Sequence, residues 1–137
     1  MFLFLAAPTA DAASDADVRI IKAQTVLIED GVITIVGEVN ASVTVIQGAQ
    51  NSGHKGATWR GRPATRVQIH ADRATLIIKR SPERTLESAW QMSVQAAKDL
   101  QDGKEVGRIG YYAPDMVIKD NLITSITGFG FLYPKGQ

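Results

Sequence analysis

A single stretch of this chain, residues 81–103, has the pattern of an amphipathic helix, and both of its flanks have the pattern of strands. Ser81 and Pro82 are typical of a helix start, and Gly103 is typical of a helix end. Apolar residues recur in between at spacings of four and three, so they form one stripe. These residues are Leu86, Trp90, Val94, Ala97 and Leu100. We therefore predict one helix at about 82–102, packed on a β-structure.

Both flanks of this helix consist of runs rich in β-branched residues, separated by residues that favour turns. Strands are predicted at 18–21, 25–29, 32–38, 42–46, 65–71, 75–80, 106–112, 116–118 and 122–133. The Asp-Gly pair at 30–31 is a strong signal for a two-residue hairpin. We also expect a turn near 72–73, a break at Pro114 and a bend at the two glycines of 128–130.

An internal repeat links the two flanks. VLIEDGVITIVG at 26–37 and MVIKDNLITSITG at 116–128 both place Asp, then Gly or Asn, between two apolar runs. Gly and Asn tolerate the positive φ of a primed hairpin turn. One interpretation is that similar hairpins converge on similar sequences. The other is that these two hairpins are equivalent edges of one barrel or sandwich.

The predicted elements follow the order strands, helix, strands, with the helix between the third and fourth major strands. Over about residues 25–133 this order resembles the OB-fold, a small Greek-key barrel. We therefore predict a mainly β fold with one α-helix (α+β), as a small antiparallel barrel with OB-like strand–helix–strand order. A β-sandwich with one packed helix is the alternative. A resemblance at the level of the fold implies little about function.

The first thirteen residues differ from the rest of the chain. They combine a short apolar run at 2–7 with Ala10-x-Ala12, which is typical of the end of a secretory signal peptide. We interpret 1–13 as a cleaved signal peptide or a flexible N-terminal arm, and 14–137 as a single β-rich domain. We expect an exported protein, periplasmic or extracellular, with a cytoplasmic protein or virion component as the alternative. The apolar run is too short to be a transmembrane span.

The sequence gives little support to catalysis. It contains no nucleophile elbow, phosphate-binding loop or dinucleotide fingerprint, and the absence of cysteine excludes disulfides and thiolate ligands. The two histidines are His54 and His70. His70 and Asp72 alternate onto one face of a predicted strand with Arg66 and Gln68, which suits acid–base or metal chemistry. Two ligands do not complete a metal site, so no metal and no cofactor is predicted. A small metal- or His-dependent enzyme using His70 and Asp72 is the alternative function.

Charge is unevenly distributed along the chain, although the net charge is only +1. Residues 1–53 carry two basic and six acidic side chains, whereas 54–85 carry eight basic and two acidic ones. The first part of the basic segment places cations around a tryptophan, a composition that binds phosphate or sulfate groups and stacks rings. The predicted binding residues are His54, Lys55, Trp59, Arg60, Arg62 and Arg66.

Three interpretations of this basic segment stay open. It contacts an anionic polymer, such as a glycan or nucleic acid; it contacts a protein neighbour, including the acidic segment of a second copy; or it is a solvated loop. A second contact is predicted at the C-terminal strand, because consecutive aromatic residues there cannot all face inward. This docking edge consists of Phe129, Phe131 and Tyr133.

These features together favour a non-catalytic, exported binding or assembly module, with self-assembly into a structural homo-oligomer as one form of it. The predicted partner is a protein or a second copy of the chain, and an anionic polymer is the other candidate.

Overall fold

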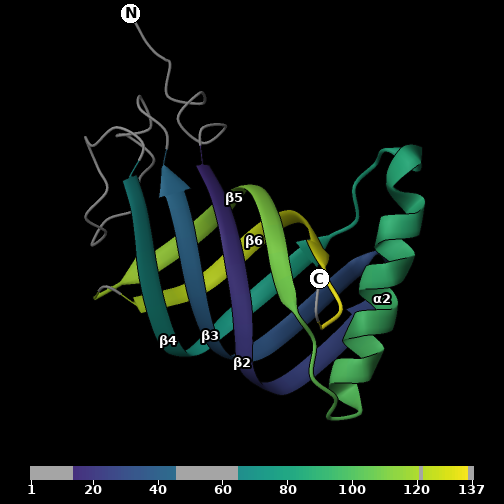
Figure 1. Cartoon of the computed structure of the whole chain (residues 1–137), viewed down its shortest axis with the longest axis horizontal. Helices are drawn as coiled ribbons and strands as arrows, with labels where there is room; N and C mark the ends of the chain where they lie inside the picture. The colour runs from purple at the N-terminus through teal and green to yellow at the C-terminus, as the bar shows by residue number, and fades with distance from the viewer. Residues whose placement is uncertain (1–13, 46–64, 121, 136–137) are drawn as a thin grey trace, which may run out of the picture.

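The computed structural model describes residues 14–45, 65–120 and 122–135, which form a closed barrel of five strands with one α-helix (Figure 1). The elements are β2 (Ser14–Glu29), β3 (Val32–Val45), β4 (Thr65–Lys79), α2 (Glu87–Gln101), β5 (Arg108–Lys119) and β6 (Leu122–Leu132). Around the barrel the strand order is β2-β3-β4-β6-β5. The mainly β fold with one helix and the OB-like strand–helix–strand order are confirmed. The sheet closes as a barrel and does not form the alternative sandwich.

Neighbouring strands are antiparallel except β4 and β6, which run parallel. A parallel pair needs a crossover connection, and α2 with β5 provides it. The barrel closes where residues 15–19 of β2 pair with residues 108–112 of β5. At one end of the barrel Val45 pairs with both Ser14 and Thr65, so residues 46–64 connect two neighbouring strand ends.

Each of the first three strands joins two runs that the sequence predicts as separate strands, and β2 and β4 carry bulges near the predicted breaks. Glu38 of β3 lies opposite two residues of β4, 72 and 73, since the flanking pairs are Gly37 with Ala74 and Val39 with Ala71. The predicted turn at 72–73 is therefore a bulge within one strand. Two further irregularities in β2 lie at the same level, so one bend crosses all three strands.

Gly37 allows the strands to approach each other at this bend. A Cβ atom on Gly37 would lie 2.1 Å from the carbonyl oxygen of Lys22 and 2.8 Å from Cα of Ala23. No side chain fits at that distance. The glycine therefore lets β2 fold across β3 and closes the curvature of the barrel.

The bend predicted at residues 128–130 lies in the neighbouring strand instead. Residues 112–115 of β5 face 127–129 of β6, so the extra residue lies beside Pro114 in a continuous β5 and not in β6. Gly130 of β6 has another role: a Cβ there would lie 2.4 Å from the Gly110 carbonyl oxygen and 3.2 Å from the ring of Tyr111. Gly130 therefore lets β6 approach β5 and leaves room for this buried ring.

The two turns of the repeat are confirmed as hairpin turns of one barrel. Asp30 and Gly31 have φ of 48° and 75°, and Asp120 has φ of 51°. The left-handed conformation at both central residues of the first turn matches the right-handed twist of the strands that it joins. The β2–β3 and β5–β6 hairpins thus occupy comparable places in the closed sheet.

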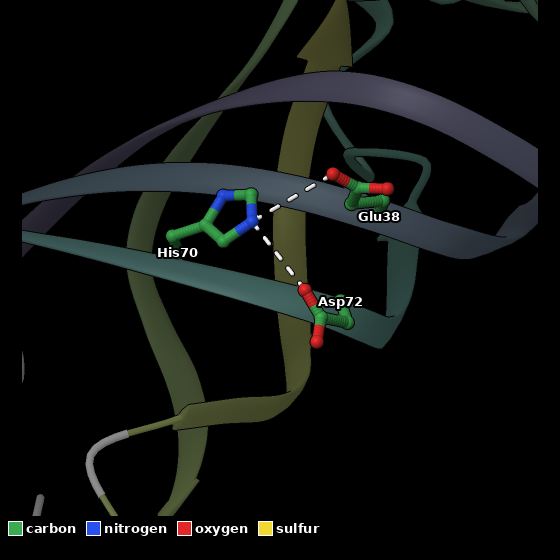
Figure 2. Close-up of side chains that lie close together, drawn as sticks. All are labelled: Glu38, His70 and Asp72. Carbon is green, nitrogen blue, oxygen red and sulfur yellow. Dashed lines mark ion pairs between the residues drawn. The ribbon is translucent and has the colours of Figure 1, made fainter.

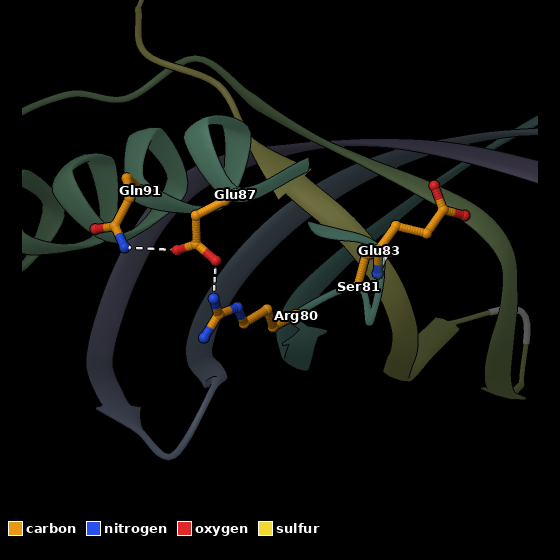
Figure 3. Close-up of polar contacts among 5 residues, drawn as sticks. All are labelled: Arg80, Ser81, Glu83, Glu87 and Gln91. Atoms are coloured by element: carbon orange, nitrogen blue, oxygen red, sulfur yellow. Dashed lines mark hydrogen bonds and ion pairs between the residues drawn. The ribbon is translucent and has the colours of Figure 1, made fainter. Parts of the chain in front are cut away.

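The helix begins later than the sequence predicts. Ser81 Oγ accepts a hydrogen bond from the Glu83 backbone N–H, which caps an isolated turn, and a 3-10 turn at Arg84–Leu86 precedes α2 (Figure 3). Arg80 at the end of β4 forms an ion pair with Glu87 in the first turn of the helix. The chain between β4 and α2 therefore serves as a connection.

The predicted helix end is confirmed. Gly103 has φ of 79°, its N–H donates to the Leu100 carbonyl, and the Lys104 N–H donates to the Asp99 carbonyl. These two bonds are the Schellman arrangement. Within the described part of the chain, no helix has the length and apolar character needed to cross a bilayer.

The barrel interior and one face of α2 form a continuous core. Inward residues alternate along each strand, among them Ile33 and Ile35 on β3 and Leu76 and Ile78 on β4, and all four are fully buried. Trp90, which belongs to the predicted apolar stripe of the helix, packs in this core. The helix covers part of the barrel beside β2 and β6.

Candidate functional site

Most of the predicted basic binding residues lie outside the described residues. His54, Lys55, Trp59, Arg60 and Arg62 belong to 46–64, and their contribution stays a prediction. Arg66 lies in β4, where its backbone pairs with Thr44, and its side chain is outside what the structure describes. Both ends of 46–64 start from the barrel end at which β2 begins.

The predicted docking edge divides into exposed and covered residues. Phe129 is exposed, whereas Phe131 is buried and its ring packs edge-on against Tyr112, with centroids 6.0 Å apart. Tyr133 is half-buried beneath Arg108, whose guanidinium carbon lies 4.5 Å from the ring centroid. The neighbouring strand therefore covers part of the predicted edge.

Apolar side chains are nevertheless exposed on this hairpin. Tyr112 and Phe129 pair across β5 and β6, and both side chains are about half exposed. Val117 and Leu122, nearer the hairpin turn, are exposed to a similar degree. We call these four residues the hairpin face. The sequence prediction of Phe129 identified one of them.

A cleft of about 600 Å³ lies between the bent part of β2 and the chain that leads from α2 into β5. This volume is within the usual range for ligand sites. Five of the residues that line it are cationic: Arg19, Lys22, Lys104, Arg108 and Lys135. Glu105 is its acidic lining residue. The cleft therefore has a strong excess of positive charge, and we call it the basic cleft.

Two of the five cations already have anionic partners. Arg108 Nη1 donates to Asp17 Oδ1 at 3.0 Å, and Lys135 bonds to the carboxylate of Glu105. The Lys135 hydrogen bond and charge hold the pKa of Glu105 below its usual value, so the pair stays ionised at neutral pH. Within the described chain, Arg19, Lys22 and Lys104 form no ion pair.

Two arginines are direct neighbours at the rim of the basic cleft. Arg19 of β2 and Arg108 of β5 are Cα partners in the pairing that closes the barrel. Like charges placed opposite each other on neighbouring strands repel, so the arrangement costs stability unless an anion lies nearby. Asp17 compensates for Arg108, and Arg19 is left exposed beside it.

No feature of the sequence predicted this cleft. Its cations come from three separated parts of the chain, and Arg19 and Lys22 belong to the segment 1–53, whose net charge is negative. Only closure of the barrel places them beside Lys104 and Arg108. An average of charge along the sequence cannot detect such a cluster.

The predicted His70–Asp72 pair is present on the outer face of the barrel. Figure 2 shows His70 between two carboxylates: its Nε2 lies 3.5 Å from Asp72 Oδ1 and 3.6 Å from Glu38 Oε1. Glu38 comes from β3 and was not predicted, because its place beside His70 depends on the register between β3 and β4, in which Asn40 pairs with His70 and Val39 with Ala71. The carboxylates and the imidazole are all accessible to solvent.

Comparisons with protein-family models, with curated proteins and with solved structures give no match to this chain.

Proposed function

We propose that this chain is a non-catalytic, exported binding module for an anionic polymer, and that the basic cleft is part of its contact surface. The observation that carries the proposal is the cross-strand pair of Arg19 and Arg108 at the cleft rim. A ligand with phosphate, sulfate or carboxylate groups would relieve this repulsion and would also meet Lys22 and Lys104.

A polymer fits the proposal better than a single small anion does. Ser14 and Arg19 of β2 are five positions apart and are therefore separated by roughly 16 Å, at about 3.3 Å per residue. Ser14 pairs with Val45, the last described residue before 46–64. A chain of several charged units would therefore reach from the cleft to this end of the barrel, where the connection whose sequence includes Lys55, Arg60 and Arg62 starts.

Export is the second part of the proposal. It rests on the signal-peptide pattern of residues 1–13, as derived from the sequence. Cell fractionation with detection of the processed N-terminus tests it, and retention of residues 1–13 in the cytoplasm would contradict it.

The binding test uses fluorescence anisotropy with a labelled single-stranded oligonucleotide and a labelled sulfated glycan, at about 50 and 200 mM salt. The triple variant Arg19→Ala, Lys22→Ala, Lys104→Ala should weaken binding at least about tenfold at low salt. For the oligonucleotide, the slope of log K against log salt should fall by about 2, since each lost contact on a single strand contributes about 0.7.

A matched control removes three exposed cations elsewhere on the barrel and helix: Lys79→Ala, Lys98→Ala, Lys119→Ala. It lowers the net charge equally and should weaken binding less than about threefold. Equal losses in the two triple variants would mean that net charge, and not the cleft, governs binding. A chain that binds neither polymer, and whose oligomeric mass changes with salt, would support the protein-neighbour interpretation instead.

The alternative of a small metal- or His-dependent enzyme stays a prediction. In that case His70→Ala or Asp72→Ala would abolish a pH-dependent activity while the fold is retained, because both side chains are accessible on the outer face. Full activity in both variants would remove this alternative.

A further inference from the structure

We propose a second binding site on the outer face of the barrel, for a divalent cation of the Zn²⁺ class, with Glu38, His70 and Asp72 as its ligands. The site shares no residue with the basic cleft. Metal binding at this site requires no catalytic activity.

The distances within this trio fit a metal better than they fit hydrogen bonds. His70 Nε2 lies 3.5 and 3.6 Å from its two carboxylate oxygens, whereas a good N–H···O bond spans about 2.7–3.2 Å. A tetrahedral Zn²⁺ with bonds of about 2.1 Å holds neighbouring ligand atoms about 3.4 Å apart. One ligand atom from each residue lies within 4.8 Å of the others.

The distance between the carboxylate oxygens of Glu38 and Asp72 can shorten without movement of the backbone. The side chain of Asp72 is 95 % exposed, so it can rotate toward Glu38 with little steric cost. Glu38 and Asp72 share the outer face with His70 because Asn40 pairs with His70, and residues two positions apart on a strand point to the same side. The rigid part of the site is therefore the pair of bent strands, and the adjustable part is Asp72.

The donor set selects the class of cation. Two carboxylates supply two negative charges, which match a divalent ion, and an imidazole nitrogen favours Zn²⁺, Ni²⁺ or Cu²⁺ over Ca²⁺ or Mg²⁺. Three protein ligands leave one position of a tetrahedral ion open to water or another ligand.

The test is calorimetric titration of the untagged chain with Zn²⁺, supported by the visible absorption of Co²⁺ as a probe of coordination. We expect one equivalent of metal per chain. His70→Gln and Glu38→Gln should each weaken Zn²⁺ binding by at least the roughly 10–100-fold that loss of a supporting contact costs at a metal site. Because the chain has two histidines, NMR can assign the imidazole that shifts with Zn²⁺ to His70 or His54.

Two control variants keep the proposal falsifiable. Arg73→Ala removes a charge from the bulge in β4 but no ligand, and His54→Gln removes the other histidine; each should change Zn²⁺ binding less than about threefold. The proposal is overturned if the unmodified chain binds no Zn²⁺, if His70→Gln binds it unchanged, or if His54→Gln alone abolishes binding. Circular dichroism of each variant confirms that the barrel is intact. Anionic-polymer binding tests the earlier proposal separately.

Discussion

At the scale of single residues, Tyr111 carries a buried hydroxyl that finds no hydrogen-bond partner among the described residues. Burial raises the pKa of this phenol above its usual value, so it stays protonated. Tyr111→Phe removes the unpaired group and keeps the ring over Gly128 and Gly130. We expect the free energy of unfolding to rise by about 1 kcal/mol, measured by urea denaturation.

The exposed neighbour provides the control for this prediction. Tyr112→Phe should change the free energy of unfolding by less than about 0.5 kcal/mol, because its hydroxyl is on the surface. A loss of stability in Tyr111→Phe would mean that the hydroxyl is hydrogen-bonded in solution.

Ser93 is a polar residue of α2 that is fully buried. Its Oγ–H donates to the Ala89 carbonyl, and its Oγ accepts from the Leu132 backbone N–H, both at 3.0 Å. Ser93→Ala leaves that buried N–H without its partner and should lower the free energy of unfolding by about 1–3 kcal/mol. Ser88→Ala, an exposed position one turn earlier, should have little effect. Equal stability of both variants in urea denaturation would contradict this role of Ser93.

At the scale of elements, the bend shared by β2, β3 and β4 depends on the absence of a side chain at Gly37. Gly37→Ala would place Cβ against the Lys22 carbonyl, and we expect a loss of about 3 kcal/mol or more. Gly103→Ala meets nothing within 4 Å and should cost about 1–2 kcal/mol, from its positive φ alone. In thermal unfolding, the Gly37→Ala variant should therefore melt at a lower temperature than the Gly103→Ala variant. A Gly37 variant as stable as the Gly103 variant would refute close contact at the bend.

The sequence predicted these elements well wherever the signal was local. The Asp-Gly turn at 30–31, the glycine end of the helix and the strand–helix–strand order need only neighbouring residues, and the structure confirms them. The breaks predicted at 72–73 and near Pro114 proved to be bulges within continuous strands. A bulge and a turn use similar residues, and they differ only in whether the partner strand continues alongside.

The candidate sites show the same difference between local sequence signals and contacts that depend on the fold. His70 and Asp72 are two residues apart, so strand alternation is enough to place them on one face. Glu38 and the Arg19–Arg108 pair depend on strand register and on closure of the barrel, which no spacing along the chain encodes.

At the scale of the whole molecule, we predict that self-assembly of this chain, the untested alternative to polymer binding, would use the hairpin face. The double variant Tyr112→Ser, Phe129→Ser should convert an oligomer to a monomer in light scattering after size exclusion, because it removes exposed apolar area. The control Leu27→Ser removes an equally exposed apolar residue from β2 and should leave the mass unchanged. A contact through this face should persist in high salt, whereas one through the basic segment should dissociate. A monomeric unmodified chain at low and high salt would remove self-assembly from the candidate functions.

The Asp17–Arg108 ion pair joins residues 91 positions apart. Contacts this distant in sequence imply an order in which the strands of the barrel pair during folding. The β2–β3–β4 meander can form as soon as its own residues are synthesised, but the first strand keeps an open edge until β5 exists. The free edge of β4 is paired later still, because its parallel partner β6 follows β5 in the chain. Folding of this chain should therefore be slow for its size, with the last step delayed until the C-terminal hairpin leaves the ribosome.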